Sequence, residues 1–155
     1  MRRQLVIAMA AAVVLSTFAL SGPAGATNIG TQGCTPGYWK NHTDNWQEYT
    51  PDTKLSELWN FPSELASFGD WTMLQALQAQ GGTGVKGATE ILVRAASAAY
   101  LNAAHEGVGY PYRRFTSPFN IQLKVNTALA SLTRSKIIGL ATTLDAANNL
   151  GCPLN

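Results

Sequence analysis

Residues 88–105 read Ala-Thr-Glu-Ile-Leu-Val-Arg-Ala-Ala-Ser-Ala-Ala-Tyr-Leu-Asn-Ala-Ala-His and set the fold class of this 155-residue chain. Alanines recur throughout, and larger apolar side chains lie between them. The only charged residues are Glu90 and Arg94, at the i,i+4 spacing of a helical ion pair. A helix that is apolar around most of its circumference is usually buried. The segment therefore predicts a central helix whose alanines let neighbouring elements pack closely.

Three further helices are predicted, one before this segment and two after it. One follows Asp70 as its N-cap and ends at Gly81-Gly82. A second begins at Ser117-Pro118, because serine suits the N-cap and proline the first helical position. A third follows Thr133 and ends near residues 150–151. No run of alternating apolar and polar residues predicts a strand, so we expect an all-α fold.

The part of the chain before these helices is rich in aromatic residues and irregular. Prolines at positions 36, 51 and 62 interrupt it, which predicts brief helical turns over residues 44–49, 55–59 and 63–68. Eight aromatic side chains fall within residues 38–71, namely Tyr38, Trp39, Trp46, Tyr49, Trp59, Phe61, Phe68 and Trp71.

The first 26 residues have the pattern of an export signal. Arg2 and Arg3 precede an apolar run over residues 5–20, a helix breaker at 21–23 and the small-residue cleavage pattern at 24–26. A permanent transmembrane helix is the alternative, but the run is short for a full span. We expect cleavage after Ala26 and a secreted, soluble protein with no membrane span. It would comprise a flexible lead-in over residues 27–33 and one domain over residues 34–155.

Cysteine use and charge limit the function classes further. Cys34 and Cys152 are the two cysteines, and an even pair in an exported protein predicts one disulfide closing the domain. A thiolate metal site would need more ligands than the sequence places nearby, so we predict no metal and no cofactor. Removal of Arg2 and Arg3 leaves nine Lys and Arg against nine Asp and Glu. This balance argues against nucleic-acid binding.

Residues 34–46, which begin the domain, read Cys-Thr-Pro-Gly-Tyr-Trp-Lys-Asn-His-Thr-Asp-Asn-Trp. Within them, residues 37–42 (GYWKNH) resemble a motif near the start of secreted or surface domains, mostly bacterial. Further segments are similar to the same family in the same order: residues 61–63, 81–84, 91–96, 101–105, 110–111 and 148–154. The resemblance covers nearly the whole mature chain. It implies an exported module, and no established activity accompanies it.

The motif also supplies the candidate binding residues, which combine flat rings with hydrogen-bonding groups. Aromatic faces stack on sugars or other rings, and amide, ammonium and imidazole groups bind hydroxyls. The alternative is that the first two rings fill the core beside the disulfide, while the amide and imidazole satisfy backbone groups. These candidates are Tyr38, Trp39, Lys40, Asn41, His42 and Trp46.

Other residue patterns allow weaker hypotheses. His42 with Asp44 or Glu106 could form an acid–base pair or metal site, with His105 as a further member. The two histidines lie 63 positions apart, and neither a zinc-protease nor a serine-hydrolase motif is present. The glycines of residues 82–87 match a dinucleotide-binding pattern, but a predicted helix rather than a strand precedes them. They predict a flexible connection.

Arg113 and Arg114 form a small basic and aromatic patch with neighbouring tyrosines and a phenylalanine, which could contact an anionic polymer.

We therefore expect a compact multi-helix single domain with an irregular aromatic-rich N-terminal part. It would act as a non-catalytic extracellular interaction or surface module, with an extracellular glycan or cell-surface component as partner. Two alternatives stay open. One is a small secreted hydrolase or metal-binding protein that uses His42 with Asp44 or Glu106. The other is a purely structural extracellular protein.

Overall fold

The computed structural model describes residues 30–154, so the expected signal peptide at residues 1–26 lies outside the described residues. Between residues 30 and 154 the chain forms helices and isolated bridges but no strand, which confirms the predicted all-α fold. The α-helices are α1 (Pro36–Asn41), α2 (Met73–Leu77), α3 (Gly84–Ala104), α4 (Ile121–Ala130) and α5 (Arg134–Asn148). Three 3₁₀ helices cover Thr43–Asn45, Leu55–Glu57 and Ser63–Phe68.

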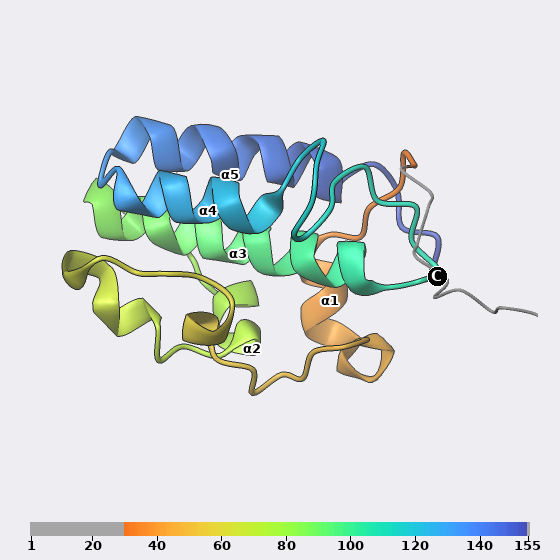
Figure 1. Cartoon of the computed structure of the whole chain (residues 1–155). Coiled ribbons are helices and arrows are strands. Elements are labelled where there is room, and N and C mark those ends of the chain that lie inside the picture. The colour runs from red at the N-terminus through yellow and green to blue at the C-terminus, as the bar shows by residue number, and fades with distance from the viewer. Residues whose placement is uncertain (1–29, 155) are drawn as a thin grey trace, which may run out of the picture.

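Helix α3 lies at the centre of the molecule, as predicted. Helices α4 and α5 cover one side of it, while α1, α2 and the irregular N-terminal part lie on the other (Figure 1). Ala96, Ala98 and Ala99 are fully buried, and α3 makes its most extensive contact with α5. The helix begins at Gly84, earlier than predicted, so residues 84–87 belong to α3 and not to the flexible connection expected over residues 82–87. Gly87 in its first turn contacts the backbone of Gly82 so closely that a Cβ would clash.

The predicted ion pair on α3 does not form. Glu90 instead accepts a hydrogen bond from the Gly81 N–H at 3.1 Å. Arg94 donates from Nη1 to the Ala79 carbonyl, also at 3.1 Å. The two charged side chains therefore hold the connection between α2 and α3, because its unpaired backbone groups lie within their reach.

Helices α2 and α4 begin later than predicted, which corrects the proposed starts at Asp70 and at residues 117–118. Thr72 caps α2 and Asn120 caps α4, each accepting a hydrogen bond from the third helical N–H. Isolated bridges pair Lys54 with Thr72 and Arg113 with Asn120. These bridges keep the backbone before each helix extended. Pairing with distant residues therefore prevents the helices from starting at the local capping signals, Asp70 and residues 117–118. The prediction that α5 follows Thr133 is confirmed.

The predicted disulfide between Cys34 and Cys152 is confirmed, with a Cα–Cα distance of 4.4 Å and a sequence separation of 118. The backbone beside it is also paired, since the Gly33 N–H donates to the Gly151 carbonyl at 3.0 Å. Gln32 bonds Gly109 through both its backbone and its side chain. The folded unit therefore includes residues 32 and 33 of the expected lead-in.

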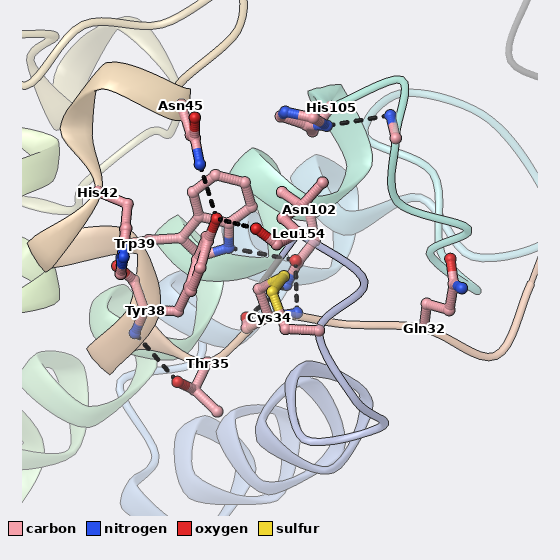
Figure 2. Close-up of a disulfide and its surroundings, with 12 residues drawn as sticks. Gln32, Cys34, Thr35, Tyr38, Trp39, His42, Asn45, Asn102, His105 and Leu154 are labelled. Carbon is pink, nitrogen blue, oxygen red and sulfur yellow. Dashed lines mark hydrogen bonds between the residues drawn. A yellow bond between two sulfur atoms is a disulfide. The ribbon is translucent and has the colours of Figure 1, made fainter.

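A buried amide network lies beside the disulfide, centred on Asn102 of α3 (Figure 2). Its Oδ1 accepts hydrogen bonds from the Cys34 N–H at 2.7 Å and from Trp39 Nε1 at 3.1 Å. Its Nδ2 donates to the Cys34 carbonyl at 2.8 Å and to Asn148 Oδ1 at 3.0 Å. All four hydrogen-bonding positions of this fully buried amide are therefore occupied.

Asn148 of α5 extends the buried amide network. Its Nδ2 donates to the Ala95 carbonyl at 2.9 Å, and its Oδ1 also accepts from the Tyr110 hydroxyl at 2.8 Å. Burial raises the pKa of Tyr110 well above its usual value, so the hydroxyl stays protonated and donates. The network thus joins the disulfide, α1, α3, α5 and the loop after α3.

Truncation of Asn102 tests the buried amide network. Asn102→Ala leaves the Cys34 amide, the Cys34 carbonyl and the Trp39 indole without partners, and each unsatisfied buried group costs about 1–3 kcal/mol. We expect the free energy of unfolding in urea to fall by about 3–5 kcal/mol. The exposed Asn41→Ala serves as control and should change it by less than about 0.5 kcal/mol. Equal effects of the two variants would contradict the role assigned to the network.

Reduction tests the disulfide. Opening a loop of this length costs about 4–5 kcal/mol in the chain-entropy model. We expect the reductant to lower the urea midpoint sharply and to expose two thiols per chain where the untreated protein has none. Unchanged gel mobility and thiol count on reduction would show that the bond is absent from the protein in solution.

Candidate functional site

Helix α1 presents the motif residues on opposite faces. Thr35 caps it by accepting the Tyr38 N–H at 3.1 Å, and Pro36 occupies its first position. This helix was not predicted, although threonine followed by proline is a typical helix start. Because successive residues of a helix point in different directions, Trp39 faces the core while Lys40 is exposed.

Trp39 is fully buried, so its ring cannot stack on a ligand. The same holds for Trp59, which is 2% exposed. Trp46 is partly buried and donates from Nε1 to the Trp39 carbonyl at 2.9 Å. This corrects the placement of Trp39 on a binding surface: its indole fills the core beside the disulfide, as the alternative proposed.

Tyr38 and His42 fasten the C-terminal segment and the turn after α1 (Figure 2). The Tyr38 hydroxyl accepts from Asn45 Nδ2 at 2.7 Å and donates to the Leu154 carbonyl at 3.3 Å. The His42 ring stacks on Tyr38 with centroids 4.2 Å apart, and its Nδ1 bonds the Tyr38 carbonyl at 2.9 Å. Asn41 is exposed at the end of the helix. The rings of Tyr38 and His42 therefore already have intramolecular partners.

The residues of the hydrolase alternative are not brought into one hydrogen-bonded group. His42 and Asp44 are exposed at the end of α1 and in the following turn. His105 is half-buried against Trp39, with ring centroids 5.8 Å apart, and the Glu106 N–H bonds Gln47 Oε1. Within residues 30–154, no group of three His, Cys, Asp or Glu residues is placed to hold a metal ion.

Arg114 of the basic and aromatic patch is also already engaged in contacts within the protein. Arg114 forms a bidentate ion pair with Glu48 at 2.7 and 2.9 Å and donates to the Tyr49 hydroxyl at 2.8 Å. Tyr110, one of the tyrosines near the two arginines in the sequence, is buried. The charge of Arg114 is therefore compensated, which leaves little attraction for an anionic polymer.

A polar cleft lies between the start of α1, the end of α2, the middle of α3 and the end of α5. Its volume is about 400 Å³. Lys40 is the one predicted binding residue on its wall, and Arg94 of α3 and Asp145 of α5 are the other charged ones. We call this hollow the polar cleft. It is lined by Thr35, Pro36, Gly37, Lys40, Leu77, Gln78, Ala79, Gln80, Arg94, Asp145 and Asn149.

The polar groups of the cleft differ in how far they are already engaged. Arg94 uses one guanidinium N–H on the Ala79 carbonyl, and Asn149 Nδ2 donates to the Asp145 carbonyl at 2.7 Å. Among the described residues, the Lys40 ammonium and the Asp145 carboxylate have no ion pair or hydrogen bond. Both charges are therefore available to a bound molecule.

A second hollow of about 480 Å³ lies between α4 and α5. It is mainly apolar and contains none of the motif residues. Lys124 and Lys136 lie on its wall, which makes them suitable controls for charge changes in the polar cleft.

Comparison with known proteins gives no relationship: no family model, no curated protein and no solved structure matches the chain. None of the helices described over residues 30–154 combines the length and the apolar character needed to cross a membrane.

The sequence identified one of the charged residues of the cleft and missed the other two. Lys40 was a candidate because it belongs to the motif. The i,i+4 spacing pairs Arg94 with Glu90, and no sequence pattern singles out Asp145. No spacing connects positions 40, 94 and 145, because they meet only when α1, α3 and α5 pack together.

The pH dependence of stability tests the placement of His105. Burial lowers the pKa of the His105 imidazole, although nearby Glu106 opposes this. Its Nδ1 accepts the Gly107 N–H at 3.0 Å, so a proton on Nδ1 would break that bond. The unfolded chain binds the proton more readily than the folded protein. The neutral His105 imidazole therefore contributes to stability at pH values above its pKa in the unfolded chain, about 6.5. This contribution is lost as the pH falls through the lower pKa of the folded state.

We expect the wild type to lose more unfolding free energy between pH 7 and pH 5 than His105→Gln does, measured in urea. Asn41→Ala, which removes no titratable group, is the control and should follow the wild type. A loss in His105→Gln as large as that in the wild type would contradict the assignment.

Proposed function

We propose that this chain is an exported, non-catalytic extracellular binding module, and that its ligand site is the polar cleft. Disulfides persist mainly in oxidising compartments, which supports export together with the signal-like residues 1–26. The ligand class proposed is an extracellular glycan, either free or on a cell surface.

One observation carries this proposal: Lys40, Arg94 and Asp145 reach the same hollow from three different helices. Ligand sites of small molecules typically enclose about 300–1,000 Å³ and fix orientation through a few convergent polar groups. Gln78 and Asn149 add amide groups to the wall of the cleft. Charged and amide side chains of this kind bind the hydroxyl groups of a sugar. The support for a glycan thus rests on hydrogen bonding rather than on aromatic stacking.

A non-catalytic role fits the composition of the cleft better than hydrolysis does. Glycoside hydrolysis typically uses two carboxyl groups that face each other across the sugar. Among residues 30–154, Asp145 is the only carboxylate on the wall of the cleft, and His42 is not part of it. A purely structural protein predicts no ligand, and Lys40 and Asp145 would then be solvated surface charges.

Binding to glycans tests the proposed function. The mature protein is mixed with insoluble glycans, purified cell walls and a panel of soluble oligosaccharides, and retention and affinity are measured. We expect binding to at least one glycan, weakened by about tenfold in Lys40→Ala and in Asp145→Ala, because each change removes a charged hydrogen bond of about 1.5–3 kcal/mol.

Lys136→Ala, in the apolar hollow between α4 and α5, is the matched control and should bind as the wild type does. Absence of any binding would leave the structural alternative, whereas equal binding by the cleft variants and the wild type would contradict the assignment of the ligand site to the polar cleft.

A further inference from the structure

We propose that the polar cleft selects an acidic sugar, with the sugar carboxylate held between Lys40 and Arg94. This inference rests on the proposed function and names the ligand class of the same site. A hydroxyl of the same sugar donates to Asp145. The ligand class is therefore a glycan that contains uronic-acid-type residues.

The charge balance of the cleft favours an anion. Its wall carries two cations, Lys40 and Arg94, and one carboxylate, Asp145. The one positive charge in excess has no partner among the lining residues. Neither Lys40 nor Asp145 forms an ion pair with any described residue. A bound carboxylate would compensate the excess charge, whereas a neutral sugar would not.

Arg94 is held in place for this role. Its guanidinium donates one hydrogen bond to the Ala79 carbonyl at 3.1 Å, and its side chain is partly buried. Glu90, one turn earlier on α3, bonds the Gly81 N–H instead of Arg94. Arginine has five N–H donors in a fixed plane, so four remain, and this fork matches the two oxygens of a carboxylate. An arginine already immobilised loses less side-chain entropy when the ligand binds.

Asp145 distinguishes an acidic sugar from a simple anion. Its carboxylate would repel a small anion that carries no donors, and it accepts hydrogen bonds from hydroxyl groups. Asn149, the residue that follows the end of α5, donates its side-chain N–H to the Asp145 carbonyl, which leaves its Oδ1 as a further acceptor. The cleft thus offers cationic donors from α1 and α3 and acceptors from α5. A molecule with a carboxylate and neighbouring hydroxyls satisfies both.

Titration calorimetry with a matched pair of probes tests the inference. The probes are an oligogalacturonate and the neutral galacto-oligosaccharide of the same length, each added to the mature protein. We expect the acidic oligomer to bind at least about tenfold more tightly, because it adds a charge-assisted hydrogen bond. The preference should shrink as salt rises, since screening weakens the attraction between exposed charges.

Two cleft variants and one control locate the effect. Arg94→Gln removes the charge and keeps a polar side chain, and Lys40→Gln changes an exposed residue that forms no hydrogen bond or ion pair with the described residues. Each should lower the affinity for the acidic oligomer by about tenfold more than it lowers the affinity for the neutral one. Lys136→Gln should alter neither. Circular dichroism melting verifies folding, and Lys40→Gln tests the inference even where Arg94→Gln is destabilised.

The outcomes separate this inference from the proposed function. Equal affinity for both oligomers, or an acidic preference that survives in both variants, overturns the carboxylate site while glycan binding stands. Binding of neutral glycans alone, with no binding of oligogalacturonate or of any other uronic-acid glycan in the panel, also overturns it. Absence of binding to every glycan, including the two oligomers, overturns both proposals.

Discussion

The buried side-chain amide of Asn102 is the constraint on which the rest of the structure depends. It occupies a fully buried position on the central helix, where an unpaired amide would be costly. It is tolerated because both its acceptor and its donor positions are used, on Cys34, Trp39 and Asn148. A satisfied buried network specifies one arrangement of the elements that it joins, since a shift of any of them leaves a polar group unpaired. The disulfide covalently secures the same region.

The buried amide network also positions the polar cleft. Lys40 directly follows Trp39, whose indole bonds Asn102. Arg94 directly precedes Ala95, whose carbonyl accepts from Asn148, and Asp145 lies one helical turn before Asn148. Each charge of the cleft is thus close in sequence to a residue of the network. The network therefore fixes the relative positions of the three helices that bring these charges together, which gives the preorganisation that a binding site requires.

The candidate site could be predicted only in part. The motif over residues 37–42 indicated a functional site, but Trp39 belongs to the core. The hydrogen bonds of Tyr38 and His42 are made within the protein. An aromatic side chain five positions after a cysteine, as Trp39 is after Cys34, can lie at the surface or in the core. Its burial depends on which elements pack against it. Arg94 showed the same ambiguity. Its spacing from Glu90 predicted an ion pair, whereas the unpaired backbone groups of the α2–α3 connection gave both side chains other partners.

The sequence by itself determined most of the central helix, two of the three brief turns among the prolines, the position of the last helix and the pairing of Cys34 with Cys152. These features follow from local periodicity, backbone restriction by proline and the count of cysteines. The turn expected over residues 44–49 is limited to Thr43–Asn45. Only the tertiary structure decided where α2 and α4 begin, because bridges from distant residues hold the preceding backbone extended. It also decided which polar residues share a cleft. Lys40, Arg94 and Asp145 lie on three helices, and their meeting depends on the packing angle and register of those helices, which no local pattern encodes.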